Sequence, residues 1–242
     1  MPPQRIKISS VDRISPGGSP SDFTIQSQVA FEGIYRLHWI YCPLTFPNIN
    51  SRNNKIYFRE NGVDKVALIE IGMYTSYSTL IDKAVTALNT VSAGVNTYSM
   101  SFSAFDGVMT VVSDTMEFAF TFGSHTEASA AEILGFAATD SESSSLSLVG
   151  VRNPNLSSTQ TLNISINKIS TICDTKTNAQ ATFTVPIQVN LGGIVFWTPP
   201  DSCPELFEFQ HRTTTLQIQV TDDAQQVLPL QNEWHCVIGK VN

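Results

Sequence analysis

The clearest periodic pattern in the chain runs from Gly72 to Val91. Apolar residues recur there at spacings of three and four, which places them on one face of a helix. They are Leu80, Ile81, Ala84, Val85, Leu88 and Val91. Ser76 or Ser78 suits the first turn, because a hydroxyl oxygen accepts hydrogen bonds from its free N–H groups, and Gly94 suits the end. This stretch predicts one long helix.

Most of the remaining chain alternates between apolar and polar residues, which is typical of strands with one buried face. Strands are predicted at 22–29, 34–46, 55–59, 66–71, 97–103, 108–113, 117–122, 162–166, 183–189, 194–197, 206–209, 215–220 and 233–241. A short helix is predicted at 126–133. The pairs Asn61-Gly62, Asp106-Gly107 and Gly192-Gly193 predict hairpins between neighbouring strands, because such residues adopt the backbone angles of tight turns.

Strands at this spacing, without alternating helices, predict an antiparallel β-sandwich. The strands before and after the long helix need each other to complete two sheets, and a jelly roll meets that need. We therefore expect a mainly all-β, antiparallel jelly-roll β-sandwich with an inserted β-α-β-β subdomain. The sandwich is expected at 22–64 and 152–242, and the insertion at 65–151. Residues 1–21 are expected to form an extended arm with one edge-strand segment at 6–8, and the arm either lies on a neighbouring subunit or is disordered.

Composition narrows the classes of function. The chain has 242 residues, a net charge of −7 and a pI of about 5.0, and only 14% of its residues are charged. A surface with so little charge suits self-association. The sequence has no basic cluster, which disfavours nucleic-acid and anionic-membrane partners. No apolar run approaches the ~20 residues needed to span a bilayer, and the start of the chain lacks an apolar signal region. We expect synthesis in the cytosol and a protein that stays soluble.

The sequence offers no chemical site. The four cysteines are far apart and form no CxxC pair, so zinc and redox motifs are absent, and buried free thiols are expected. The histidines show no metal-ligand spacing, and neither a GxSxG elbow nor a phosphate-binding glycine loop occurs. The cysteines are Cys42, Cys173, Cys203 and Cys236, and the histidines are His38, His125, His211 and His235. We expect no catalytic, metal or cofactor-binding residues, and no enzyme, although a site assembled only in space would escape this reading.

Two further groups have ordinary structural readings. Asp222 and Asp223 lack the spaced oxygen ligands of a calcium loop, so a solvated turn is expected. Asn155 and Asn163 match the glycan-acceptor pattern, and both matches are read as chance.

Four aromatic residues fit either the core or an interface, with the core favoured for most of them. They are Tyr35, Trp39, Tyr41 and Trp197.

Several short motifs occur together in a recognisable order. The first is Ile8-Ser-Ser-Val-Asp-Arg13, followed by a Gly/Ser/Pro break and Ser21-Asp-Phe23-Thr-Ile25. The next are Phe46-Pro-Asn-Ile-Asn50 and Ile71-Gly-Met-Tyr-Thr75, which opens the long helix. Ile133-Leu-Gly-Phe136 and Leu228-Pro-Leu230 with Trp234 come last. In this order they resemble the jelly-roll capsid proteins of virophages, Polinton-like viruses and related double-stranded DNA viruses.

This resemblance implies a structural protein of the virion. A chain with strands for one sandwich is similar to the single jelly-roll penton protein, which forms homopentamers at icosahedral vertices beside neighbouring major capsid proteins. The insertion would then project outward and could meet a host receptor, and no catalytic residue is carried over.

Three alternatives remain open. One is a trimeric minor capsid, spike or cement protein. Another is a carbohydrate- or receptor-binding β-sandwich module. The third is a metal enzyme on a jelly roll, against which the lack of a histidine cluster counts.

Overall fold

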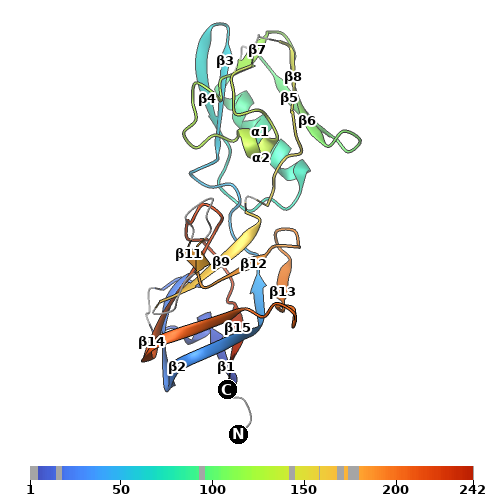
Figure 1. The fold of residues 1–242 in the computed structure, drawn as a ribbon. Helices are drawn as coiled ribbons and strands as arrows, with labels where there is room; N and C mark the ends of the chain where they lie inside the picture. The colour runs from blue at the N-terminus through green and yellow to red at the C-terminus, as the bar shows by residue number, and fades with distance from the viewer. Residues whose placement is uncertain are drawn as a thin grey trace. The chain divides into compact units, whose positions relative to one another are not determined.

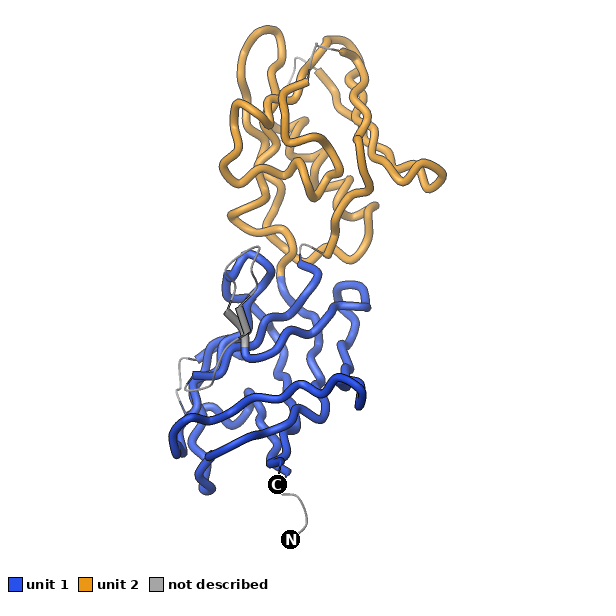
Figure 2. The backbone as a smooth tube through the Cα atoms, in the orientation of Figure 1, with its two compact units in different colours: residues 1–46, 159–242 blue, residues 47–158 orange. Residues whose placement is uncertain are grey.

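The computed structural model describes residues 5–14, 18–92, 96–141, 145–157, 159–167, 172–173 and 180–241 (Figure 1). The chain divides into two compact units (Figure 2). Unit 1 combines residues 1–46 with 159–242, and unit 2 spans residues 47–158. Each unit has its own hydrophobic core.

Unit 1 is built on a seven-stranded antiparallel sheet. Its strand order is β1 (Arg5–Ser9), β15 (His235–Lys240), β2 (Asp22–Pro43), β14 (Leu206–Thr221), β9 (Thr161–Ile166) and β12 (Phe183–Pro186), and β13 (Ile194–Trp197) pairs with β2. A 3-10 turn, η1 (Ser10–Asp12), follows β1, and β10 (Ile172–Cys173) pairs with β11 (Gln180–Ala181). The predicted mainly β, antiparallel, jelly-roll-like sandwich is thereby confirmed.

Two strands of unit 1 are longer than the sequence predicted. β2 and β14 each run unbroken where two shorter strands were expected. Their mutual register shifts between Phe209 and Thr213 and again before Thr215, and Gly33 has a positive φ of 85°. Such bulges change the phase of the inward and outward positions without ending the strand. The alternating pattern therefore looks interrupted although pairing continues.

The core of unit 1 is rich in aromatic rings from these two strands. Phe31 packs against Phe209 at 5.1 Å between ring centroids, and Tyr35 meets Phe209 edge-on at 5.2 Å. Burying an aromatic or large aliphatic side chain contributes about 1.5–3 kcal/mol. This cluster therefore holds the two paired strands together on the buried side of their sheet.

The N-terminal segment belongs to the sandwich. Ile8 is buried, and β1 pairs with β15 at the edge of the sheet. The Ser10 N–H donates to the Trp234 carbonyl at 3.0 Å, the Trp234 N–H donates to Ser10 Oγ at 2.9 Å, and the Trp234 indole donates to the Pro20 carbonyl at 2.7 Å. The expected edge strand at 6–8 is confirmed as part of β1. The expected free or neighbour-bound arm is corrected for the described residues up to 21, because the edge of β15 and the Trp234 ring hold them on their own sandwich.

Unit 2 places the long helix between two small sheets. One sheet has the order β4 (Val63–Leu68), β3 (Lys55–Glu60), β7 (Phe118–Phe120), and the other β5 (Tyr98–Ser103), β6 (Val108–Ser113), β8 (Ser147–Val149). The helices are α1 (Tyr77–Val91) and α2 (Ala131–Leu134). Ser76 caps α1 by accepting from the Thr79 N–H at 3.3 Å.

The apolar face of α1 is narrower than the pattern suggested. Leu80, Ala84 and Leu88 are buried in the unit 2 core, whereas Val91 is 37% exposed. Gly94, the expected stop, lies outside the described residues. The other predicted helix, at 126–133, is shorter than expected and begins only at Ala131, since the positive φ of Ala128 is incompatible with helix.

The three predicted hairpins have different outcomes. Asn61-Gly62 forms a two-residue turn with φ of 49° and 73°, as expected. β5 and β6 also form a hairpin, but through the four residues 104–107 instead of a tighter turn. Gly192-Gly193 does not join a hairpin: β12 pairs with β9, and β13 pairs with β2. The turn chemistry is real, but strand pairing there is set by long-range partners.

The division of the chain also differs from the expected boundaries at 64/65 and 151/152. β3, which was assigned to the sandwich, pairs with β4 and β7 inside unit 2. Near the start of unit 2 the buried Asn48 amide donates to the carbonyls of Tyr74 at 3.0 Å and Leu156 at 2.6 Å. This side chain ties both ends of unit 2 together, so the unit extends from 47 to 158.

Candidate interaction surfaces

The outer side of strands β2, β13 and β15 in unit 1 carries a group of aromatic rings, here called the aromatic face. His235 stacks on Tyr41 at 4.9 Å and meets Trp39 edge-on at 5.4 Å. Trp39 also lies 6.0 Å from Phe196, which is 66% exposed. Adjacent rings of this kind can bury a large apolar area in a contact with another molecule.

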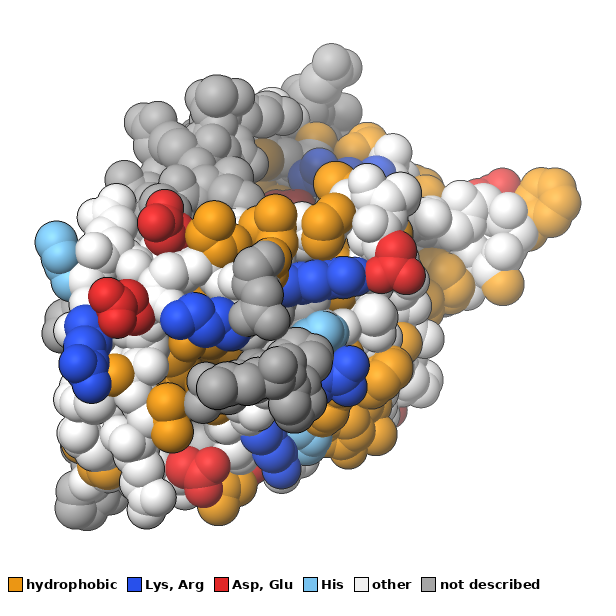
Figure 3. Space-filling view, turned by 60° about the horizontal axis from the view of Figure 1, so that its bottom comes forward, with side chains coloured by type: hydrophobic (Ala, Val, Ile, Leu, Met, Phe, Trp, Pro, Cys, Tyr) orange, Lys and Arg blue, Asp and Glu red, His pale blue; other side chains and the backbone are white. Residues whose placement is uncertain are grey.

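Several basic side chains lie on the strands that carry or flank the aromatic face, and one of them, Arg36, is ion-paired with Asp201. Arg5 and Lys7 are exposed on β1, and burial together with the charges of Arg5 and Arg36 lowers the pKa of His38. Burial and the charge of Lys7 likewise lower the pKa of His235. Figure 3 shows Lys, Arg and His side chains gathered on the side that it views. Because these residues come from the first, second and last strands of the sheet, the sequence showed no basic cluster.

The four aromatic residues singled out in the sequence occupy different places. Tyr35 is buried in the core, and Trp197 is partly buried against it. Trp39 and Tyr41 are half-buried on the aromatic face. The core reading therefore holds for Tyr35 and Trp197, and the other two remain available for an interface. Phe196 and His235 complete the face and were missed because single positions in short strands give no such signal.

The histidines and acids do not converge on a metal site. His125 stacks on Tyr57 at 5.0 Å in unit 2, and His211 is exposed in unit 1. Across the described parts of the chain, no three His, Cys, Asp or Glu side chains are grouped as metal ligands.

Asp222 is a buried anchor, which corrects the expected solvated turn at that position, whereas Asp223 is exposed in the turn as expected and also bonds to its neighbours. Asp222 is buried and accepts from the Ala224 and Gln226 N–H groups at 2.9 and 2.8 Å. Asp223 accepts from the Gln160 N–H at 2.6 Å and from the hydroxyl of Thr159 at 3.0 Å. The two carboxylates thus fix the segment where the chain re-enters unit 1.

The cysteines differ in their surroundings. Cys42 and Cys236 are free and buried, and burial raises the pKa of each thiol to about 12. Cys203 is free and exposed, and the side chain of Cys173 lies outside the described part of the chain. The expectation of buried free thiols therefore holds for Cys42 and Cys236 and is wrong for Cys203. Thiol chemistry at neutral pH is suppressed at the two buried positions, since only the thiolate is reactive.

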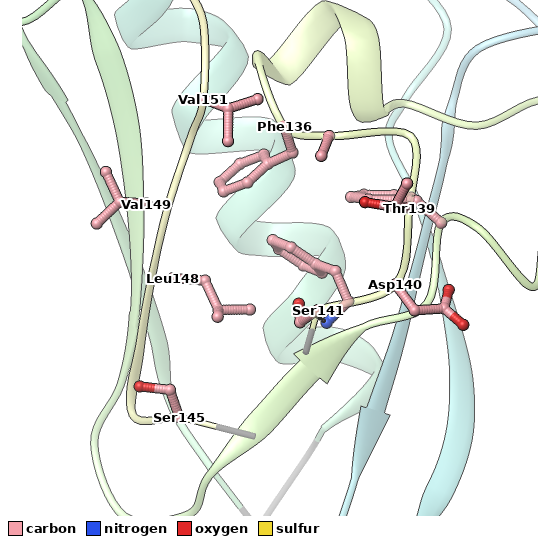
Figure 4. Close-up of a pocket in the computed structure, with 11 residues that line it drawn as sticks. Phe136, Thr139, Asp140, Ser141, Ser145, Leu148, Val149 and Val151 are labelled. Carbon is pink, nitrogen blue, oxygen red and sulfur yellow. Dashed lines mark hydrogen bonds between the residues drawn. The ribbon is translucent and has the colours of Figure 1, made fainter. Parts of the chain in front are cut away.

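Unit 2 contains a pocket of about 310 Å³ between β7 and β8, here called the unit 2 pocket (Figure 4). Its lining is mainly apolar and comes from Phe120, Phe122, Phe136, Ala137, Leu148, Val149 and Val151, with Thr139, Asp140, Ser141 and Ser145. The Asp140 carboxylate accepts from Ser124 and from the Gly123 N–H at 2.8 Å, and these bonds lower its pKa. Figure 4 shows this carboxylate pointing away from Leu148.

The lining of the unit 2 pocket suits the binding of an apolar group and offers little for catalysis. Its one ionised side chain is already bonded to Ser124 and Gly123, and its centre is formed by aromatic and aliphatic carbon. The alternation of Phe118, Phe120 and Phe122 predicted a strand, but it gave no sign that two of these rings would line a cavity.

Comparison with known proteins gives one kind of likeness. No protein-family description and no curated protein matches the chain. Among solved structures, the crystal structure of the selenomethionine-labelled mavirus penton protein matches with a TM-score of 0.53 and 8% sequence identity. The match covers 98% of this chain and 99% of the other. No helix in the described residues has the length and apolar character to cross a membrane. At this identity the likeness shows a shared fold, and it confirms the resemblance to virophage penton proteins at that level.

Proposed function

We propose that this chain is a viral capsid protein that forms the penton, a homopentamer at the vertices of an icosahedral shell. The observation that carries the proposal is the extent of the shared fold. It spans nearly the whole length of both chains, so it includes the inserted unit as well as the sandwich. A jelly roll alone serves many functions, whereas this combination is more specific.

A five-membered ring requires heterologous contacts, in which one face of a subunit meets a different face of the next. The aromatic face supplies an anchor for such a contact, because Phe196 is largely exposed and Trp39 supports it from the neighbouring strand. Both units carry a net negative charge, unit 1 with eight Lys or Arg against ten Asp or Glu and unit 2 with six against eleven, so net charge alone selects no partner surface.

Light scattering of the purified protein tests the proposal directly. We expect a species five times the 26.5 kDa chain mass, with five-fold rings in negative-stain images. A trimer would contradict the penton and favour a minor capsid or spike protein. A monomer at every accessible concentration would also contradict it.

The aromatic face has a second test. Phe196→Ser should weaken assembly without lowering the unfolding temperature, because the ring is mostly exposed. The control is Leu68→Ser, which replaces an exposed apolar residue of unit 2, away from the aromatic face of unit 1. Binding of a glycan array by the wild-type monomer, lost in Phe196→Ser, would instead support a carbohydrate-binding module.

A further inference from the structure

The β5–β6 hairpin of unit 2 ends in an unusually exposed aromatic residue. Phe105 is 97% exposed, although it lies at the tip of a regular hairpin closed by the pairing of Ser103 with Val108. Figure 1 shows this hairpin extending away from α1. A phenyl ring exposed to this degree adds nothing to the core of its own chain, and its apolar surface is available to another molecule.

The tip is held in shape before any contact. Asp106 accepts from the Ser103 hydroxyl at 3.3 Å, and Ser103 Oγ accepts from the Asp106 N–H at 3.2 Å. Gly107 has a φ of 69°, and a Cβ there would lie 2.0 Å from Asn153 Oδ1, so the tip rests directly on that side chain. A preformed tip loses little conformational entropy when it docks.

The unit 2 pocket has the size and lining that a phenyl ring requires. A dry apolar cavity of about 150 Å³ is enough to hold benzene, and this pocket measures about 310 Å³. Phe120, Phe122 and Phe136 form its wall, and Val149 and Val151 at its rim are 56% and 68% exposed. An aromatic ring that entered would bury these exposed side chains together with its own surface.

The charges beside the tip and the pocket are complementary. Phe105 is followed by the exposed carboxylate of Asp106, and Val151 by the exposed guanidinium of Arg152. Arg152 donates to the carbonyl of Phe136, a pocket residue, at 3.4 Å, which places its charge at the pocket. Within the described residues neither Asp106 nor Arg152 forms an ion pair. Asp140 on the far side is occupied by Ser124 and Gly123.

We propose that Phe105 of one copy inserts into the unit 2 pocket of a neighbouring copy, with Asp106 facing Arg152. The contact is heterologous, because the tip and the pocket are different surfaces, and such contacts form a ring when the rotation between successive copies closes. This inference rests on the proposed homopentamer and names one of its contacts.

The decisive experiment mixes two variants that each gain one cysteine, both in a Cys173→Ser, Cys203→Ser background that keeps only the buried Cys42 and Cys236. One carries Phe105→Cys at the tip, and the other carries Val149→Cys at the pocket rim. Mild oxidation of the mixture should give a disulfide-linked dimer that neither variant gives alone. A mixture that assembles normally but yields no tip-to-rim dimer overturns the contact and leaves the penton intact, whereas a wild-type chain that never assembles overturns the proposed function.

Charge reversal gives an independent readout. Asp106→Arg and Arg152→Asp should each raise the concentration needed for half-assembly on the order of tenfold or more, and the combined variant should restore assembly. Phe105→Ala should do the same with an unchanged unfolding temperature, while the control Leu68→Ala should assemble like wild type. Normal assembly of Phe105→Ala would count against the contact. So would a variant that keeps the assembled mass of the wild type but binds phosphatidylcholine vesicles less well, because Phe105 would then contact a membrane.

Discussion

Tyr98 donates its hydroxyl to Glu60 at 3.1 Å inside the core of unit 2. The same carboxylate accepts from Ser92 Oγ at 2.5 Å, and its other oxygen binds the ammonium of Lys65. Glu60 is fully buried, so burial alone would raise its pKa, but the bonds from Lys65, Ser92 and Tyr98 outweigh burial and hold the pKa below the usual value. A charged group at the junction of β3, α1 and β5 is therefore part of the core.

Glu60→Gln should destabilise unit 2 by about 1–3 kcal/mol, because Lys65 loses its partner and one buried acceptor is replaced by a donor. The two units can be followed separately. Trp39, Trp197 and Trp234 all lie in unit 1, and amide exchange in α1 reports on unit 2. We expect faster exchange in α1 and an unchanged tryptophan signal, and equal loss in both probes would contradict a local role.

The lowered pKa of Glu60 also predicts a pH dependence. The charged form is favoured in the folded state, so its contribution is fully present above the ordinary pKa of 4.5 and is lost as the pH falls toward the folded value. Wild-type unit 2 should therefore weaken in acid more steeply than the Glu60→Gln variant. Parallel stability profiles of the two proteins below pH 4.5 would show that Glu60 does not act through its charge.

The α1 helix offers a prediction with an internal control. Leu88 is buried beneath the helix, so Leu88→Ala should cost about 2–5 kcal/mol of unfolding free energy. Val91→Ala, at an exposed position on the last turn, should cost much less. Urea denaturation followed by circular dichroism compares the two, and similar values would mean that the Leu88 contacts contribute little.

Replacing two glycines that have similar positive φ angles should separate the cost of backbone strain from the cost of a steric clash. Gly62 has a φ of 73°, and no atom lies within 4 Å of the position that a Cβ would take there. Gly135 has a φ of 77°, and its Cβ would lie 2.3 Å from the Arg152 carbonyl oxygen. Gly62→Ala should cost about 1–2 kcal/mol from strain alone. Gly135→Ala should cost about 1–3 kcal/mol more from the clash, and thermal melts giving equal losses would contradict that difference.

Ser10→Ala should loosen the N-terminal segment. The Ser10 hydroxyl accepts from the Trp234 N–H and donates to Glu233, so its removal leaves a buried donor without a partner and costs about 1–3 kcal/mol. Ser99→Ala on the exposed side of β5 serves as control. Amide exchange of residues 5–14 should accelerate only in Ser10→Ala, and protection equal to wild type would show that β1 alone holds the segment.

A feature of the fold could be predicted from the sequence when the residues that determine it lie close together along the chain. The Asn61-Gly62 hairpin and the α1 helix are encoded within a few turns of chain, so both could be predicted. The boundary of unit 2 could not, because Ile56 and Phe58 are buried and apolar whether they pack on the sandwich or on α1. The aromatic face and the unit 2 pocket escaped for the same reason, since Trp39, Phe196 and His235 meet only after folding.

The division into two units also determines the order in which the protein can form during synthesis. Among the residues that the structure describes, every partner of a unit 2 strand lies within residues 47–158, so that unit can form once residue 158 has emerged from the ribosome. The edge of unit 1 must wait, because Arg5 pairs with Gly239 and β2 pairs with β14 and β15. Until the last residues appear, the long β2 strand has open edges that could pair with other nascent chains. Unit 2, from the middle of the chain, can therefore fold first, and β1 and β2, which are synthesised earliest, complete their pairing only when the C-terminal strands are available.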